Sequence, residues 1–232
     1  MDCVWKIKKC MKNKYIDKII SFIWIAIIAL IITILILPDS KSIFIELTRQ
    51  HPYLMGIIKF GLLGTMGELL SFKIITGNWK IKGIGLYQRV IIWTIIGILL
   101  TLAFPLFSYG IDGIINQGLL PGKESPILIA FWKSFFMQLI FAFPFMTFHR
   151  FTDTLIERNL LFSKWPVVEI YKGIDWKNMF NVVGVSIIVF WLPVQTFNFL
   201  LPSEFRVIVA ALLAIVLGFI LGMAKRLSLQ KK

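Results

Sequence analysis

Six long apolar runs, separated by short polar stretches, make up most of the chain. They cover about residues 19–38, 52–76, 90–110, 127–148, 179–201 and 206–224. Each run is close to the roughly 20 apolar residues that a helix needs to cross a bilayer. The second and fourth runs contain charged residues, whereas the other four carry none between their flanks. The pattern predicts an all-α fold, a polytopic transmembrane helical bundle of about six spans.

The runs also divide the chain into segments. Residues 1–18 form a basic N-terminal segment, and 19–38 an additional N-terminal span. That span is too long for the apolar part of a signal peptide, and no small-x-small cleavage site follows it, so we expect a retained signal anchor. The remaining runs form one helical bundle without a separable second domain, and residues 225–232 form a basic tail.

Composition supports this interpretation. The 232 residues are 58% hydrophobic and 16% charged, with a mean hydropathy of +0.82. A soluble domain of this length has too little interior for that much apolar surface. Cys3 and Cys10 have no metal-binding or redox spacing. We expect reduced cytoplasmic thiols, with S-acylation as the alternative.

The formal net charge of +13 follows the predicted topology. With the N-terminus inside, the inner segments hold 18 of the 25 Lys and Arg residues, and the outer loops hold only Lys41, Arg49, Lys123 and Arg206. Because cytoplasmic loops carry the excess of basic residues, both termini are predicted to be cytoplasmic. Anionic lipid headgroups are the expected partner, and nucleic acid is not needed to explain the charge. The Ile- and Lys-rich composition favours a bacterial plasma membrane.

A carboxylate lies inside the second span. At 100° per residue, one face of about 120° gathers the small and polar residues of this span: Gly61, Gly64, Gly67, Glu68 and Ser71. Lys59 and Lys73 fall on roughly the opposite side, where we expect them to reach for the two interfaces. A small face allows close helix packing. Glu68 should therefore point into a helix–helix seam or a water-filled cavity.

No cation is predicted at the depth of Glu68. Lys133 in the fourth span lies about 15 Å nearer the outer face, too far for direct pairing. Two interpretations stay open. Glu68 lines a hydrated cavity or is protonated, or it is a carboxyl group hydrogen-bonded to a neighbouring helix.

Two further patterns concern packing. The last span has a small-residue face that includes Gly218 and Gly222, suited to close packing inside the bundle or to a homo-oligomer. Three spans contain a proline that removes a backbone donor and is expected to kink its helix: Pro105, Pro144 and Pro193.

Enzyme signatures are absent from the sequence. His51 and His149 lie at predicted interfaces on opposite sides of the membrane, and there is no metal-ligand cluster, HExxH, GxSxG or P-loop. We therefore expect no catalytic activity, no cofactor and no metal.

Two stretches resemble the Mpv17/PMP22 family of small organellar membrane proteins. HPYLMGIIKFGLLGTMGELLS matches at His51, Pro52, Gly61, Gly67, the acid at 68 and Ser71. FWLPVQTFNFLLPSEFR matches at Trp191, Pro193, Gln195, Asn198, Phe199, Pro202 and Arg206. The sequence departs from the family by having Glu in place of the usual Asp, by one-residue shifts at Pro193 and Pro202, and by lacking the closing motif. Between the stretches the match thins to Pro105, Tyr109, Lys133 and Gln138.

The resemblance implies a distant, bacterial member with an added anchor helix, and residues 51–224 would form its family domain. The family is associated with weakly selective pores, so we expect a channel-like pathway for a small solute or ion. The residues expected to line it, or to serve as intramembrane polar groups, are Glu68, Ser71, Lys133, Gln138, Gln195 and Asn198. Arg206 should pair with Glu204 or hold the outer ends of the last two spans together. The alternative is a non-transporting membrane scaffold or an assembly or stress factor, in which the cytoplasmic loop 149–178 lies on the membrane surface and binds partners.

Overall fold

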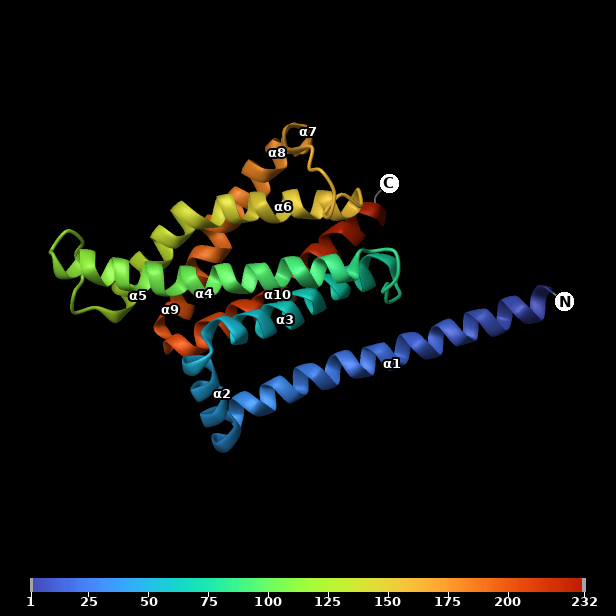
Figure 1. Cartoon of the computed structure of the whole chain (residues 1–232), viewed down its shortest axis with the longest axis horizontal. Helices are drawn as coiled ribbons and strands as arrows, with labels where there is room; N and C mark the ends of the chain where they lie inside the picture. The colour runs from blue at the N-terminus through green and yellow to red at the C-terminus, as the bar shows by residue number, and fades with distance from the viewer. Residues whose placement is uncertain (1, 231–232) are drawn as a thin grey trace.

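The computed structural model describes the backbone of residues 2–230, and side chains from residue 15 onward except those of 224 and 228. This part of the chain is helical and contains no strand (Figure 1). Six helical segments are long and apolar enough to cross a membrane: Tyr15–Ile36, Pro52–Thr76, Leu86–Asn116, Pro126–Glu157, Trp176–Leu200 and Ser203–Leu227. The predicted class, an all-α bundle of six spans, is confirmed.

The elements follow in the order α1 (Asp2–Ile36), α2 (Pro38–Gln50), α3 (Pro52–Thr76), α4 (Leu86–Asn116), α5 (Pro126–Phe136), η1 (Met137–Ala142), α6 (Phe143–Glu157), α7 (Val167–Gly173), α8 (Trp176–Asn178), η2 (Met179–Gly184), η3 (Ile187–Trp191), α9 (Leu192–Leu200) and α10 (Ser203–Gln230). The η segments are π-helical. With an even number of spans, the two ends of the chain lie at the same end of the bundle (Figure 1). We call this the inner end, following the charge bias.

Helix α3 is the centre of the packing, with α10 on one side and α4 on the other. A Cβ added at Gly218 would lie 2.2 Å from the Gly67 carbonyl oxygen, and one at Gly97 would lie 2.3 Å from that of Gly56. Gly222 packs against Ser71 in the same α3–α10 seam. The backbones therefore touch where side chains are missing. The predicted small faces of the second and last spans pack inside the bundle.

Two of the three intramembrane prolines follow π-helical turns. Pro144 is the second residue of α6, directly after η1, and Pro193 is the second residue of α9, directly after η3. Proline lacks an N–H and its ring clashes with the carbonyl four residues earlier. A widened turn relieves that clash, and π-helical turns are a recognised cause of helix distortion. Pro105 lies inside α4, which stays helical on both sides of it.

Two segments differ from the sequence-based expectations. Residues 39–50, expected as an outer loop, form most of α2 because Pro38 starts a helix and Asp39 stands in its first turn. Residues 149–157, expected on the membrane surface, continue α6 from the fourth span, and Thr152 and Leu155 are fully buried.

The polar contacts of helix α1 with the bundle lie in its inner half, while partly buried apolar residues such as Ile31 and Ile34 pack against the core farther out. Trp24 Nε1 donates to the Met66 carbonyl oxygen at 3.2 Å, and Trp79 Nε1 donates to Ser21 Oγ at 2.8 Å. Lys73 pairs with Asp17. Lys73 therefore anchors α1 and does not extend freely into the interface as expected. The most apolar stretch of α1 has no buried residue.

Candidate functional site

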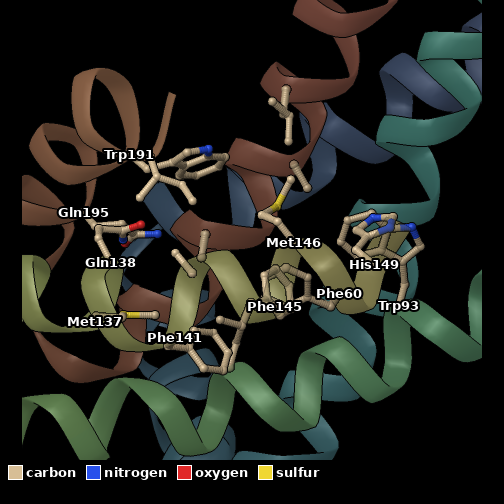
Figure 2. A pocket seen from close by; sticks show the side chains of 16 residues that line it. Phe60, Trp93, Met137, Gln138, Phe141, Phe145, Met146, His149, Trp191 and Gln195 are labelled. Atoms are coloured by element: carbon tan, nitrogen blue, oxygen red, sulfur yellow. The ribbon is translucent and has the colours of Figure 1, made fainter. Parts of the chain in front are cut away.

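A central cavity runs between α4, α10 and the distorted helices of the fourth and fifth spans. Its volume is about 90 Å³, and it is lined mainly by apolar side chains. Its polar groups gather at two ends, with Trp93 and His149 at one and Gln138 and Gln195 at the other (Figure 2). The structure thus brings together two of the predicted polar residues, from η1 and α9. Trp191, from the second family-like stretch, lines the same end.

Gln195 is the first member of a hydrogen-bonded chain. Asn198 Nδ2 donates to Gln195 Oε1 at 2.9 Å and to the Arg206 carbonyl oxygen at 3.1 Å. Asn198 is 2% exposed, and its Oδ1 has no hydrogen-bond partner in the described part of the chain. A buried acceptor without a partner is uncommon, and water or a ligand group usually satisfies such an atom.

Glu68 belongs to an ionic cluster at the inner end. Its carboxylate accepts from Arg89 Nη1 at 2.6 Å and from Trp93 Nε1 at 3.0 Å. The expectation that no cation lies at its depth is wrong. Helix α4 begins at Leu86, so Arg89, assigned to a loop from hydropathy, is already within the helix.

The same cluster includes a second carboxylate, on α6. Asp153 Oδ1 lies 3.4 Å from Arg89 Nη1, and its Oδ2 lies 3.3 Å from His149 Nδ1. The His149 ring meets the Trp93 ring edge-on at 5.0 Å between centroids. A Cβ at Gly64 would overlap Trp93, so glycine at that position admits the indole. We call Glu68, Arg89, Trp93, His149 and Asp153 the inner network.

The inner network borders the central cavity. Trp93 and His149 line the cavity and also bind the two carboxylates, whereas Glu68 is not among the lining residues. Glu68 therefore contacts the cavity through Trp93. Because the network joins α3, α4 and α6, it holds these helices together at the inner end.

An outer cavity of about 410 Å³ lies between α2, α3, α4, α5 and α10. Two ion pairs border it: Lys133 donates to Asp112 Oδ2 at 2.8 Å, and Arg49 donates to Glu204 Oε1 at 2.7 Å. Lys133 is thus separate from Glu68, as its depth predicted. Glu204 pairs with Arg49, and the alternative that Arg206 pairs with Glu204 is not observed.

Two other cations in the outer cavity bind neutral groups. Lys59 is 4% exposed, donates to Thr48 Oγ1 at 2.9 Å and lies 4.4 Å from the centre of the Phe44 ring. The expectation of an interface-seeking Lys59 is wrong, because α2 covers it. Arg206 donates to the carbonyl oxygens of Leu201 and Phe199, and to a hydroxyl on α4. It holds together the outer ends of α9 and α10.

The central and outer cavities lie one above the other. On α4, Leu100 lines the central cavity and Phe104 lines the outer one. On α10, Ala210 lines the central cavity and Val207 the outer one. The two residues of each pair are about one helical turn apart. Phe104 and the buried Phe199 meet edge-to-face, with centroids 5.5 Å apart. We call this aromatic pair the septum.

Several residues that the sequence analysis singled out lie outside the central cavity. His51 separates α2 from α3 and is exposed, and Pro52 begins α3 at the edge of the outer cavity. Pro202 lies in the turn between α9 and α10. Ser71 packs in the α3–α10 seam.

Sequence reasoning missed most of the inner network and the septum. One signal was available: His149 and Asp153 are four residues apart, the spacing at which helical side chains meet. Arg89 and Phe199 had no local signal that would have placed them opposite Glu68 and Phe104.

No family model, curated protein or solved structure matches this chain. The six apolar helices define an integral, multi-pass membrane protein.

Proposed function

We propose that the protein forms a gated, weakly selective pathway for small solutes or ions across its membrane. The observation that carries the proposal is the stacking of two cavities along one bundle, with Phe104 of the septum lining the outer one. We propose that the septum separates them. Ligand sites in helical bundles commonly lie between helices, and polar residues within spans commonly mark a passage. Gln138 and Gln195 would contact the solute in the central cavity.

In this proposal the arrangement corresponds to a closed state. The septum would block exchange between the cavities, and the inner network would close the central cavity toward the cytoplasm. The π-helical segments beside the cavity support a mobile role, since such turns are frequent at functional sites. Opening would require the helices joined by Arg89 to separate.

The resemblance to the Mpv17/PMP22 family supports the same proposal. Trp191 and Gln195 line the central cavity, and Arg206 lines the outer one. We propose that the chain is a distant relative of that family. On this view its localisation would be a bacterial plasma membrane, with anionic headgroups against the basic inner face.

The test is flux in proteoliposomes, measured as conductance and as efflux of small trapped solutes. Phe104→Ala and Phe199→Ala remove the two halves of the septum, and both should increase flux above the wild-type rate. Phe197→Ala is the matched control, because Phe197 is two residues from Phe199 on the same helix but 66% exposed. It should leave flux unchanged.

Glu68→Gln provides the complementary test at the inner end. Glutamine keeps the shape of the side chain but removes its charge, so Arg89 is held less strongly. We expect altered selectivity or pH dependence of flux. No flux in the wild type or any variant, with all of them folded and equally stable, would favour the scaffold function, in which these contacts serve packing alone.

A further inference from the structure

The outer cavity carries more positive than negative charge. Its lining residues include the basic Arg49, Lys59, Lys133 and Arg206, and two acidic residues, Asp112 and Glu204. Each carboxylate is engaged by one base, Asp112 by Lys133 and Glu204 by Arg49. Lys59 and Arg206 therefore make up the cationic excess.

Lys59 is a buried cation without a counter-charge. In the part of the chain that the structure describes, its ammonium group binds a hydroxyl and an aromatic face, and no carboxylate lies within ion-pair distance. A charge removed from water is costly unless an opposite charge or several hydrogen bonds compensate it. An ammonium group has three N–H donors, and Thr48 accepts one. The remaining donors and the uncompensated charge suit an anion.

Arg206, which is partly buried, supplies a second cation with unused N–H donors. Its Nε donates to the Leu201 carbonyl oxygen at 3.0 Å, its Nη2 to that of Phe199 at 3.1 Å, and its Nη1 to Ser108 Oγ at 3.1 Å. A guanidinium group has five N–H donors, so one on each terminal nitrogen is still free. These hydrogen bonds also fix the position of the planar group, which favours recognition of phosphate and carboxylate.

We infer that the outer cavity is a binding site for an oxyanion, the phosphate or carboxylate group of a small solute, held by Lys59 and Arg206. The inference rests on the proposed function, because it names the class of solute that the pathway accepts. An anion there would compensate Lys59 and use the free N–H groups of Arg206. The paired Lys133 and Arg49 would contribute less, since Asp112 and Glu204 neutralise them.

The test measures binding directly, without flux. The purified full-length chain in neutral detergent is titrated calorimetrically with inorganic phosphate and with succinate. We expect saturable binding by the wild type and at least tenfold weaker binding by Lys59→Gln. Lys123→Gln is the matched control: it removes an exposed lysine from an outer loop without touching the cavity, and should bind as the wild type does.

Lys59→Arg keeps the charge and should retain most of the affinity. This variant separates the effect of the charge from a structural effect of Lys59→Gln. If misfolding caused the loss of affinity, keeping the charge would not restore binding. The inference would be overturned if wild type and Lys59→Gln bound phosphate and succinate equally, or if neither soluble anion nor anionic lipid bound saturably.

A lipid phosphate has the same chemistry as a free phosphate, so a second arm separates the sources. The titration is repeated in nanodiscs with and without phosphatidylglycerol. If phosphatidylglycerol leaves the phosphate affinity unchanged, the site is assigned to a soluble anion. If phosphatidylglycerol competes with phosphate in the wild type, and this competition disappears in Lys59→Gln, the site is assigned to a lipid headgroup. Flux without anion binding would overturn this inference alone, and anion binding without flux would overturn the proposed pathway alone.

Discussion

The inner network and the part of the outer cavity around Lys59 and Arg206 differ in how their charges are compensated. At the inner end, Arg89 lies between Glu68 and Asp153, and His149 binds the latter carboxylate as well. In the outer cavity, among the side chains that the structure describes, Lys59 and Arg206 hydrogen-bond only to neutral acceptors and lie over aromatic rings. A charge whose partners belong to the same protein holds helices together. A charge without such a partner keeps its capacity to bind something else.

Both arrangements use helix α3. Lys59 and Glu68 are nine residues apart on it, or about 13 Å along the helix axis. The glycine seam with α10 fixes this helix in place, so the two charged groups are held on a rigid element. The contrast between the ends predicts different costs for removing a cation from each.

The largest loss of stability is expected from Arg89→Met. The substitution leaves Glu68 and Asp153 partly buried without their shared cation, and breaking a buried pair in this way costs about 3–5 kcal/mol. The free energy of unfolding, measured by steric trapping in bicelles, should fall by that amount. Arg158→Met is the control, because Arg158 pairs with Glu169 at side-chain exposures of 43% and 67%. Its loss should stay below about 1 kcal/mol, and equal losses would contradict the contrast.

A smaller loss is expected from closing the glycine seam that holds α3. In Gly218→Ala the added Cβ would lie 2.2 Å from the Gly67 carbonyl oxygen, which forces α3 and α10 apart. Overpacking of this kind costs about 1–3 kcal/mol in unfolding free energy. Gly110→Ala in α4 adds the same methyl group with nothing within 4 Å, and should be neutral or slightly stabilising.

Lys133→Met tests the paired part of the outer end. It leaves Asp112 without its cation, but the Asp112 side chain is 40% exposed and can be hydrated. We expect a loss of about 1 kcal/mol in unfolding free energy. The double variant Lys133→Met with Asp112→Asn should recover most of this loss, because the uncompensated carboxylate is removed. A double variant less stable than either single one would argue against the pairing.

Lys59→Met should have the smallest effect. No carboxylate is left behind, and the desolvation cost of the ammonium group disappears, so the unfolding free energy should change by less than about 1 kcal/mol or rise. The same steric-trapping measurement checks it beside Arg89→Met. A loss as large as that of Arg89→Met would show that Lys59 serves the fold, which would remove the contrast between the two ends.

The sequence allowed a good prediction of the spans and of the faces that pack. The glycine faces of the second and last spans could be read because helical periodicity places Gly61, Gly64 and Gly67 on one side, and Gly218 and Gly222 likewise. The partners of the buried charges could not be predicted in the same way. The depth of each residue in the membrane was estimated from the ends of the apolar runs. Those ends placed Arg89 in a loop, although α4 already includes it.

By itself, the sequence determined that this is a membrane protein with six apolar spans, and it predicts that the basic segments lie on one side. Those properties depend on the cost of placing each residue in lipid, which is local and additive along the chain. Only the tertiary structure decided that Glu68 meets Arg89, that α2 covers Lys59, and that Phe104 packs against Phe199. Those contacts join residues far apart in the chain, so they depend on how the helices pack and where each one begins.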